Sequence, residues 1–302
     1  MMIRHIMIKN IKNNKVIKTC LTVMLVSAAF IFGVGFQRVS ELKNPTKGGN
    51  KAEVLADKSK VLPDAGFTLP ISWGDLGPRL ISLGVIDKDK FASTVNLNSE
   101  EEKILNEGGD ISITINEDNS QFVVDLLWAI GLAQKSEAYT KGPMGTDYKK
   151  DIGNFASTGG WTLAKGKAVN YLGKYELFNL TDEQQNRVAE IAKNIYRPCC
   201  GNSTWFPDCN HGMAALAAIE MMVAKNLSND EIYRNVLKLN SFWFPSTYMN
   251  IATYFERKGI KWDKIDAKIV LGSDYSSGQG SANIAKEVGP VPGSSGGGSC
   301  GA

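Results

Sequence analysis

Apolar and polar positions alternate with helical spacing along most of the chain after residue 67. Apolar side chains that recur every three or four residues are typical of helices with one face in a core. Five longer segments show this spacing, at residues 122–130, 188–195, 211–223, 232–239 and 251–255. Shorter helices are expected over residues 76–83, 87–91 and 98–105.

Local signals predict where several of these helices begin and end. Thr181 with Gln184 and Ser228 with Glu231 have the three-residue spacing of a capping box, which satisfies free N–H groups at a helix start. Pro198 is expected to end the 188–195 helix, because the residue before a proline avoids helical geometry. Ser246 is expected to cap the 251–255 helix, which Gly259 would close.

Only residues 111–116 alternate with the period of two that is typical of a strand, with isoleucines at every second position. The helical segments follow one another through short connections, as in antiparallel helix arrangements. The pattern therefore predicts a mainly α fold, an antiparallel helix bundle or array with at most a minor β element, preceded by one transmembrane helix.

The predicted transmembrane helix is the apolar run at residues 19–36. Such a run is close to the length that spans a bilayer core of about 30 Å. Residues 1–47 carry eight basic side chains and one acidic one, and the lysines before the run favour a cytoplasmic N-terminus. A cleaved signal peptide is the rival interpretation, with Gly33 and Gly35 near the cleavage position, but the run is long and no A-x-A sequence follows it.

The sequence divides into five parts. They are a basic cytoplasmic segment (1–18), a single-pass anchor (19–36), a Lys-rich linker (37–66), a helical extracytoplasmic domain (67–288) and a Gly/Ser tail (289–302). Beyond residue 47 the chain carries 26 basic and 30 acidic side chains, so its charge gives no reason to expect nucleic acid as a partner. The membrane is the predicted partner, and the sequence points to no particular protein or small molecule.

Candidate chemistry is concentrated in residues 196–213, which read YRPCCGNSTWFPDCNHGM. Cys199 and Cys200 follow one predicted helix, and Cys209 and His211 begin the next. If these helices are antiparallel neighbours, the loop gathers thiols and an imidazole, which are ligands for Zn²⁺ or Cu(I). The sequence therefore predicts a cysteine/histidine cluster that binds a metal ion or is redox-active. Cys300, in the C-terminal tail, could supply a further sulfur. The predicted metal ligands are therefore Cys199, Cys200, Cys209, His211 and Cys300.

Two other interpretations of this segment stay open. In an oxidising compartment Cys209 could pair with Cys199 or Cys200, and the chain would then be a disulfide-stapled scaffold or binding module. A thiol with His211 and Asp208 could instead serve as the nucleophile, base and orienting group of a cysteine hydrolase. Glu220, a carboxylate in the apolar part of the 211–223 helix, is expected to face solvent.

The words YRPCC, FPDCNHGMA and NFASTGGW resemble those of membrane-anchored exported prokaryotic proteins that have no assigned activity. The resemblance covers roughly residues 67–300 and includes the cysteine near the C-terminus. It implies that the cysteine/histidine segment is the distinguishing feature of such proteins. It implies no reaction, ligand or substrate.

Overall fold

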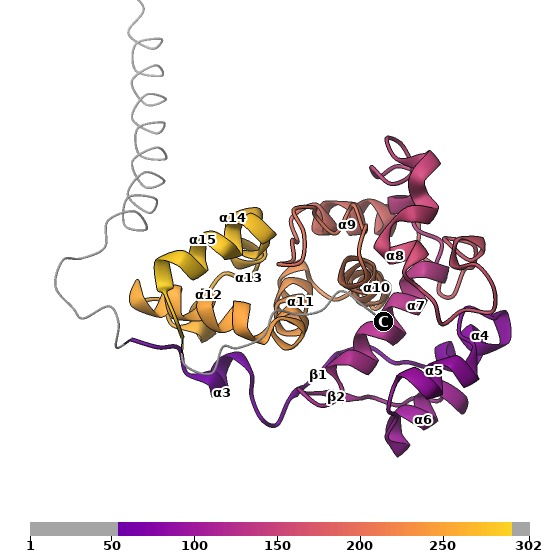
Figure 1. Cartoon of the computed structure of the whole chain (residues 1–302), viewed down its shortest axis with the longest axis horizontal. Coiled ribbons are helices and arrows are strands. Elements are labelled where there is room, and N and C mark those ends of the chain that lie inside the picture. Colours follow the sequence, from indigo (N-terminus) through magenta and orange to yellow (C-terminus); the bar gives the residue numbers. More distant parts are fainter. Residues whose placement is uncertain (1–53, 292–302) are drawn as a thin grey trace, which may run out of the picture. The chain divides into compact units, whose positions relative to one another are not determined.

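The computed structural model describes residues 54–291, which form a mainly helical fold (Figure 1). Six helices of the described part exceed ten residues, and the last of them closes the fold. These six are α7 (Ser120–Ala133), α9 (Asp182–Ala192), α10 (Asn210–Ala224), α11 (Asn229–Trp243), α12 (Pro245–Arg257) and α15 (Gly278–Val288). The predicted mainly α character is therefore confirmed for this part of the chain.

Shorter elements connect these helices. The short α-helices are α3 (Lys58–Val61), α4 (Leu76–Leu83), α5 (Lys88–Thr94), α6 (Ser99–Asn106), α8 (Ala156–Gly159), α13 (Ala267–Val270) and α14 (Ser273–Ser276). The 3₁₀ turns are η1 (Glu137–Tyr139), η2 (Lys149–Asn154), η3 (Ala168–Asn170) and η4 (Trp262–Lys264). Strands β1 (Phe67–Thr68) and β2 (Thr114–Ile115) form one antiparallel pair in which Phe67 lies opposite Ile115. The expected minor β element is present, but only two residues of the 111–116 alternation are strand.

The predicted capping boxes are present. The Thr181 hydroxyl accepts from the backbone N–H of Gln184, whose side chain accepts from the backbone of Thr181, and Ser228 with Glu231 makes the same exchange at α11. Such local hydrogen bonds depend on neighbouring residues alone, which makes helix starts readable from sequence.

Helices α7 and α10 form the centre of the core. Every residue from Asn210 to Val223 is buried, as is every residue from Phe122 to Ala133. Helices that are apolar all round belong inside a fold rather than at its surface. The two helices pack directly against each other, and α9 and α11 pack on α10 (Figure 1). The close approach occurs at Gly131, where an added Cβ would lie 2.5 Å from the carbonyl oxygen of Met213.

We expect Gly131→Ala to destabilise the fold by about 1–3 kcal/mol, because the methyl group would force α7 and α10 apart. Gly153→Ala is the matched control, since its Cβ would meet its nearest neighbour at 3.5 Å, an ordinary contact. Urea denaturation of both variants measures the difference. Equal midpoints for the two variants would show that the helices tolerate wider spacing.

Two helix boundaries differ from the sequence expectation. Helix α9 ends at Ala192 rather than at Pro198, because the following backbone bonds elsewhere: Thr204 donates to the carbonyl of Ile195, and the N–H of Tyr196 donates to Leu271. Helix α12 begins at Pro245, whose missing N–H suits the first helical position, so Ser246 lies within the helix and does not cap it.

The folded part begins before Phe67, earlier than expected. Helix α3 packs against α12, and Ala56, Val61 and Leu62 are buried. The end of the expected linker, from residue 54 onward, is therefore part of the core rather than a free connection. The C-terminal helices α13 to α15 were likewise not anticipated by the apolar spacing.

No helix within residues 54–291 is long and apolar enough to cross a bilayer. The predicted basic segment (1–18), the anchor (19–36) and the first part of the linker lie outside the described residues, as does the tail from residue 292 with Cys300.

Glu220 does not face solvent, contrary to the sequence expectation. Its side chain is fully buried in α10, and neither carboxylate oxygen has a hydrogen-bond partner among the described residues. Burial raises the pKa of Glu220 to about 8, although the nearby Ser136 hydroxyl opposes this shift. Glu220 is buried because the other elements enclose α10 on all sides, so no face of this helix is exposed to solvent at that position.

The buried Glu220 predicts a stability that falls as pH rises. A raised folded pKa stabilises the protein fully below about pH 4.5, and this contribution is lost as pH rises through about 8. We expect wild type to lose up to about 1.4 kcal/mol per pH unit in this window relative to Glu220→Gln. Denaturant unfolding at pH 5 and pH 8 tests this, with the exposed Glu190→Gln as control. Parallel pH profiles for wild type and Glu220→Gln would contradict it.

Candidate metal centre

The candidate site lies in the loop that joins α9 to α10. After α9 the chain is held by backbone bonds from Tyr196 to Leu271 and from Thr204 to Ile195. The N–H of Gly278, at the start of α15, donates to the carbonyl of Cys200 at 2.7 Å. The bonds with Leu271 and Gly278 fix the loop against the C-terminal helices, so its side chains are positioned by the fold.

The loop brings three sulfurs together. The Sγ atoms of Cys199, Cys200 and Cys209 all lie within 4.8 Å of one another, and Cys199 Sγ is 3.4 Å from Cys209 Sγ. All three are free thiols; Cys209 is buried and the other two are half-buried. Three sulfurs around one Zn²⁺ at about 2.3 Å would be roughly 4 Å apart. The predicted gathering of the three cysteines is therefore confirmed, and the cluster could hold a metal ion.

A buried arginine organises the cluster. The Arg197 guanidinium is fully buried, and its Nε donates to Cys209 Sγ at 3.1 Å. One Nη donates to the carbonyl of Asn202, and the other donates to the carbonyl of Phe206 and to Asp208 Oδ1 at 2.8 Å. The guanidinium thus fixes the loop through four acceptors, as its planar fork of donors allows.

Helix α10 begins at this cluster. Cys209 is the N-cap, and its sulfur accepts from the N–H of Gly212 at 3.4 Å. A Cβ at Gly212 would lie 2.4 Å from an Arg197 Nη atom, so glycine makes room for the guanidinium beside the helix. A helix N-terminus and a guanidinium both favour a negative charge on this sulfur.

The three thiols differ in acidity. Hydrogen bonds from the Cys199 and Cys200 thiols, together with the Arg197 charge, hold the pKa of Cys209 well below its usual range despite burial. The interaction with Cys200, then that with Cys209 and burial, raises the pKa of Cys199. For Cys200, the interaction with Cys199 lowers the pKa, but that with Cys209 and burial raise it to about 11. Cys209 is therefore the most acidic of the three thiols.

His211 lies outside the sulfur group. Its ring nitrogens are not within the set of ligand atoms that share the 4.8 Å radius. The ring packs on Phe244 and Trp243, and its Nδ1 pairs with Asn210 Oδ1 at 2.8 Å. Burial lowers the pKa of His211 to about 4, so the imidazole is neutral at pH 7. His211 does lie in the first turn of α10, as the sequence predicts, but its side chain packs against Trp243 and Phe244 and does not join the sulfurs.

The sequence reasoning missed Arg197 and Gly212. Arg197 immediately precedes Pro198 and the cysteine pair, and a basic residue beside three thiols was the available signal. Asp208 was considered as an orienting group for His211; in the structure it pairs instead with Arg197 and accepts from Asn202 Nδ2 at 2.7 Å.

Comparison of the chain with protein-family models, curated proteins and solved structures gives no match. The resemblance to membrane-anchored exported proteins therefore stays an expectation, and any function must be argued from the geometry of the site.

We expect Arg197→Gln to raise the pKa of the most acidic thiol toward the usual range, because the variant removes the charge beside Cys209. Thiolate absorbance against pH measures this in the reduced protein. The control is Arg234→Gln, which alters an exposed cation paired with Asp230. A thiolate that titrates at the same pH in both variants would mean that the neighbouring thiols and the helix N-terminus suffice.

Proposed function

We propose that the chain binds one Zn²⁺ ion through Cys199, Cys200 and Cys209, with the fourth position open to water or to Cys300. The observation that carries the proposal is the convergence of three sulfurs, one of which accepts hydrogen bonds from Arg197 Nε and from the Gly212 N–H at the N-terminus of α10. Thiolates select Zn²⁺ and Cu(I) among the common metal ions.

Charge balance favours a divalent ion. We propose that Cys209, whose pKa is lowered, is the one thiolate of the metal-free cluster. Because Arg197 and Asp208 form an ion pair, the cluster then carries a single negative charge. Binding requires deprotonated ligands. Exchange of the Cys199 and Cys200 protons for Zn²⁺ leaves the charge unchanged, whereas Cu(I) with three thiolates would add a negative charge to a largely buried site. A net change of buried charge carries a desolvation cost.

The location follows the sequence. We propose that residues 19–36 anchor the chain in a membrane and that the metal site lies on the extracytoplasmic side. The support is the apolar run and the basic residues before it.

A disulfide-stapled scaffold is the second candidate. The specific observation in its favour is the 3.4 Å approach of Cys199 and Cys209, which leaves little movement for a sulfur–sulfur bond of about 2.05 Å. A cysteine hydrolase has less support, because no hydrogen bond among the described residues joins the His211 ring to a sulfur.

The test is a Zn²⁺ titration of the full-length reduced chain against a chromophoric chelator. We expect one ion per chain, with two protons released per ion in calorimetry across buffers of different ionisation enthalpy. Cys209→Ser should weaken Zn²⁺ binding by more than the roughly 10–100-fold that is typical when a residue that only hydrogen-bonds to a metal ligand is replaced. His211→Ala should keep the stoichiometry, and Cys300→Ser shows whether the tail supplies the fourth ligand.

Two outcomes would reject the proposal. One is a chain with all three thiols reduced that takes up no Zn²⁺, whether or not it takes up Cu(I). The other is a Cys209→Ser variant that retains wild-type affinity. A chain purified without reductant that lacks metal and has two of the thiols paired would support the scaffold instead.

A further inference from the structure

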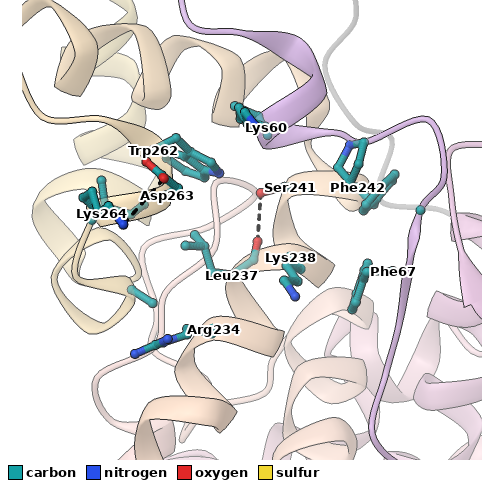
Figure 2. Close-up of a pocket in the computed structure, with 15 residues that line it drawn as sticks. Lys60, Phe67, Arg234, Leu237, Lys238, Ser241, Phe242, Trp262, Asp263 and Lys264 are labelled. Atoms are coloured by element: carbon teal, nitrogen blue, oxygen red, sulfur yellow. Dashed lines mark hydrogen bonds and ion pairs between the residues drawn. The ribbon is translucent and has the colours of Figure 1, made fainter.

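A cavity of about 540 Å³ lies between helix α3, strand β1, helix α11 and the segment from η4 to α13 (Figure 2). Its apolar wall includes Phe67 and Phe242, whose rings stack at a centroid distance of 5.7 Å, together with Leu237 and Trp262. The volume lies within the range of pockets that enclose small molecules. None of its lining residues belongs to the cysteine cluster.

The cavity is lined by cations from three segments. Lys60 comes from α3, Arg234 and Lys238 from α11, and Lys264 from η4, and Figure 2 shows Lys60 and Arg234 on opposite sides. Asp263 is the only carboxylate among the residues that line it. The lining therefore carries an excess of positive charge beside the apolar wall.

These cations form only weak ion pairs, or none, with carboxylates of the described residues. Arg234 is 3.6 Å from Asp230 and Lys264 is 3.8 Å from Asp263, and all four side chains are largely exposed. Exposed pairs of this kind contribute little. The Lys238 ammonium lies 5.6 Å from the centroid of the Phe67 ring, and no carboxylate of the described residues forms an ion pair with Lys60 or Lys238. Their charge remains available to an external anion.

We infer that this cavity binds a small molecule with an apolar, ring-sized body and an anionic group such as a carboxylate, phosphate or sulfonate. The body would lie against Phe67, Phe242 and Trp262, and the anion would lie near Arg234 and Lys238, which are one helical turn apart on α11. A neutral ligand of the same shape would contact only the apolar lining. The excess of cations therefore predicts discrimination by charge.

The test compares two matched probes on the full-length chain. One is 8-anilinonaphthalene-1-sulfonate and the other is the uncharged N-phenyl-1-naphthylamine, which lacks only the sulfonate. We expect the anionic probe to bind more tightly, and its affinity to fall as salt is raised. The double variant Arg234→Gln/Lys238→Gln should bind the sulfonate roughly tenfold more weakly and the neutral probe unchanged.

Lys167→Gln is the matched control, because Lys167 is exposed and lies outside the cavity lining. Both altered positions of the double variant are exposed, and a thermal unfolding curve equal to that of wild type confirms that the fold is retained. Equal affinity for the two probes would overturn the inference. The inference would also be overturned if the double variant and the Lys167→Gln control changed the affinity for the sulfonate probe by the same factor.

Discussion

The buried guanidinium of Arg197 is the interaction on which the cysteine loop depends. A charge removed from water is tolerated only if nearby groups compensate it, and here Asp208, the Cys209 sulfur and two backbone carbonyls do so. Each acceptor comes from the loop itself, so the loop can adopt this path only when it wraps the guanidinium. That arrangement contributes to the acidity of Cys209, after the interactions with Cys199 and Cys200, and it requires the glycine at position 212.

The loop is also bonded to the core. The N–H of Ser157 in α8 donates to the carbonyl of Asp208, and the Trp128 indole of α7 donates to the carbonyl of Ser157 at 2.6 Å. A continuous set of hydrogen bonds therefore joins the central helix to the residue that pairs with Arg197. The cysteines are held by the same packing that holds α7 against α10, which makes the cluster a preorganised feature of the fold rather than a flexible appendage.

Much of the helical pattern was readable from the sequence, because its causes are local. The capping boxes at Thr181 and Ser228 need only neighbouring residues, and the cysteines meet because α9 and α10 are consecutive. What was not readable depended on distant partners. The end of α9 is set by bonds from Thr204 and to Leu271, the burial of Glu220 by helices that enclose α10, and the role of Arg197 by how the loop closes around it.

The three sulfurs differ in acidity and in exposure to solvent. Cys209 is buried with Arg197, and its pKa is lowered by the interactions with Cys199 and Cys200 and by the guanidinium, while its sulfur also caps the N-terminus of α10. Cys199 and Cys200 are half-buried, and their pKa values are raised. Cys199 Sγ lies 3.4 Å from Cys209 Sγ, and the Cys200 thiol donates to the carbonyl of Asn202 and to Asp208 Oδ1, both at 3.8 Å. In the proposed metal site, an ion would meet the sulfur of Cys209 as its most acidic ligand, and the two more accessible thiols would complete the coordination as they release their protons to solvent. Such an order would give selectivity for ions that compete with protons for sulfur, because harder cations gain too little from thiolate to displace the protons.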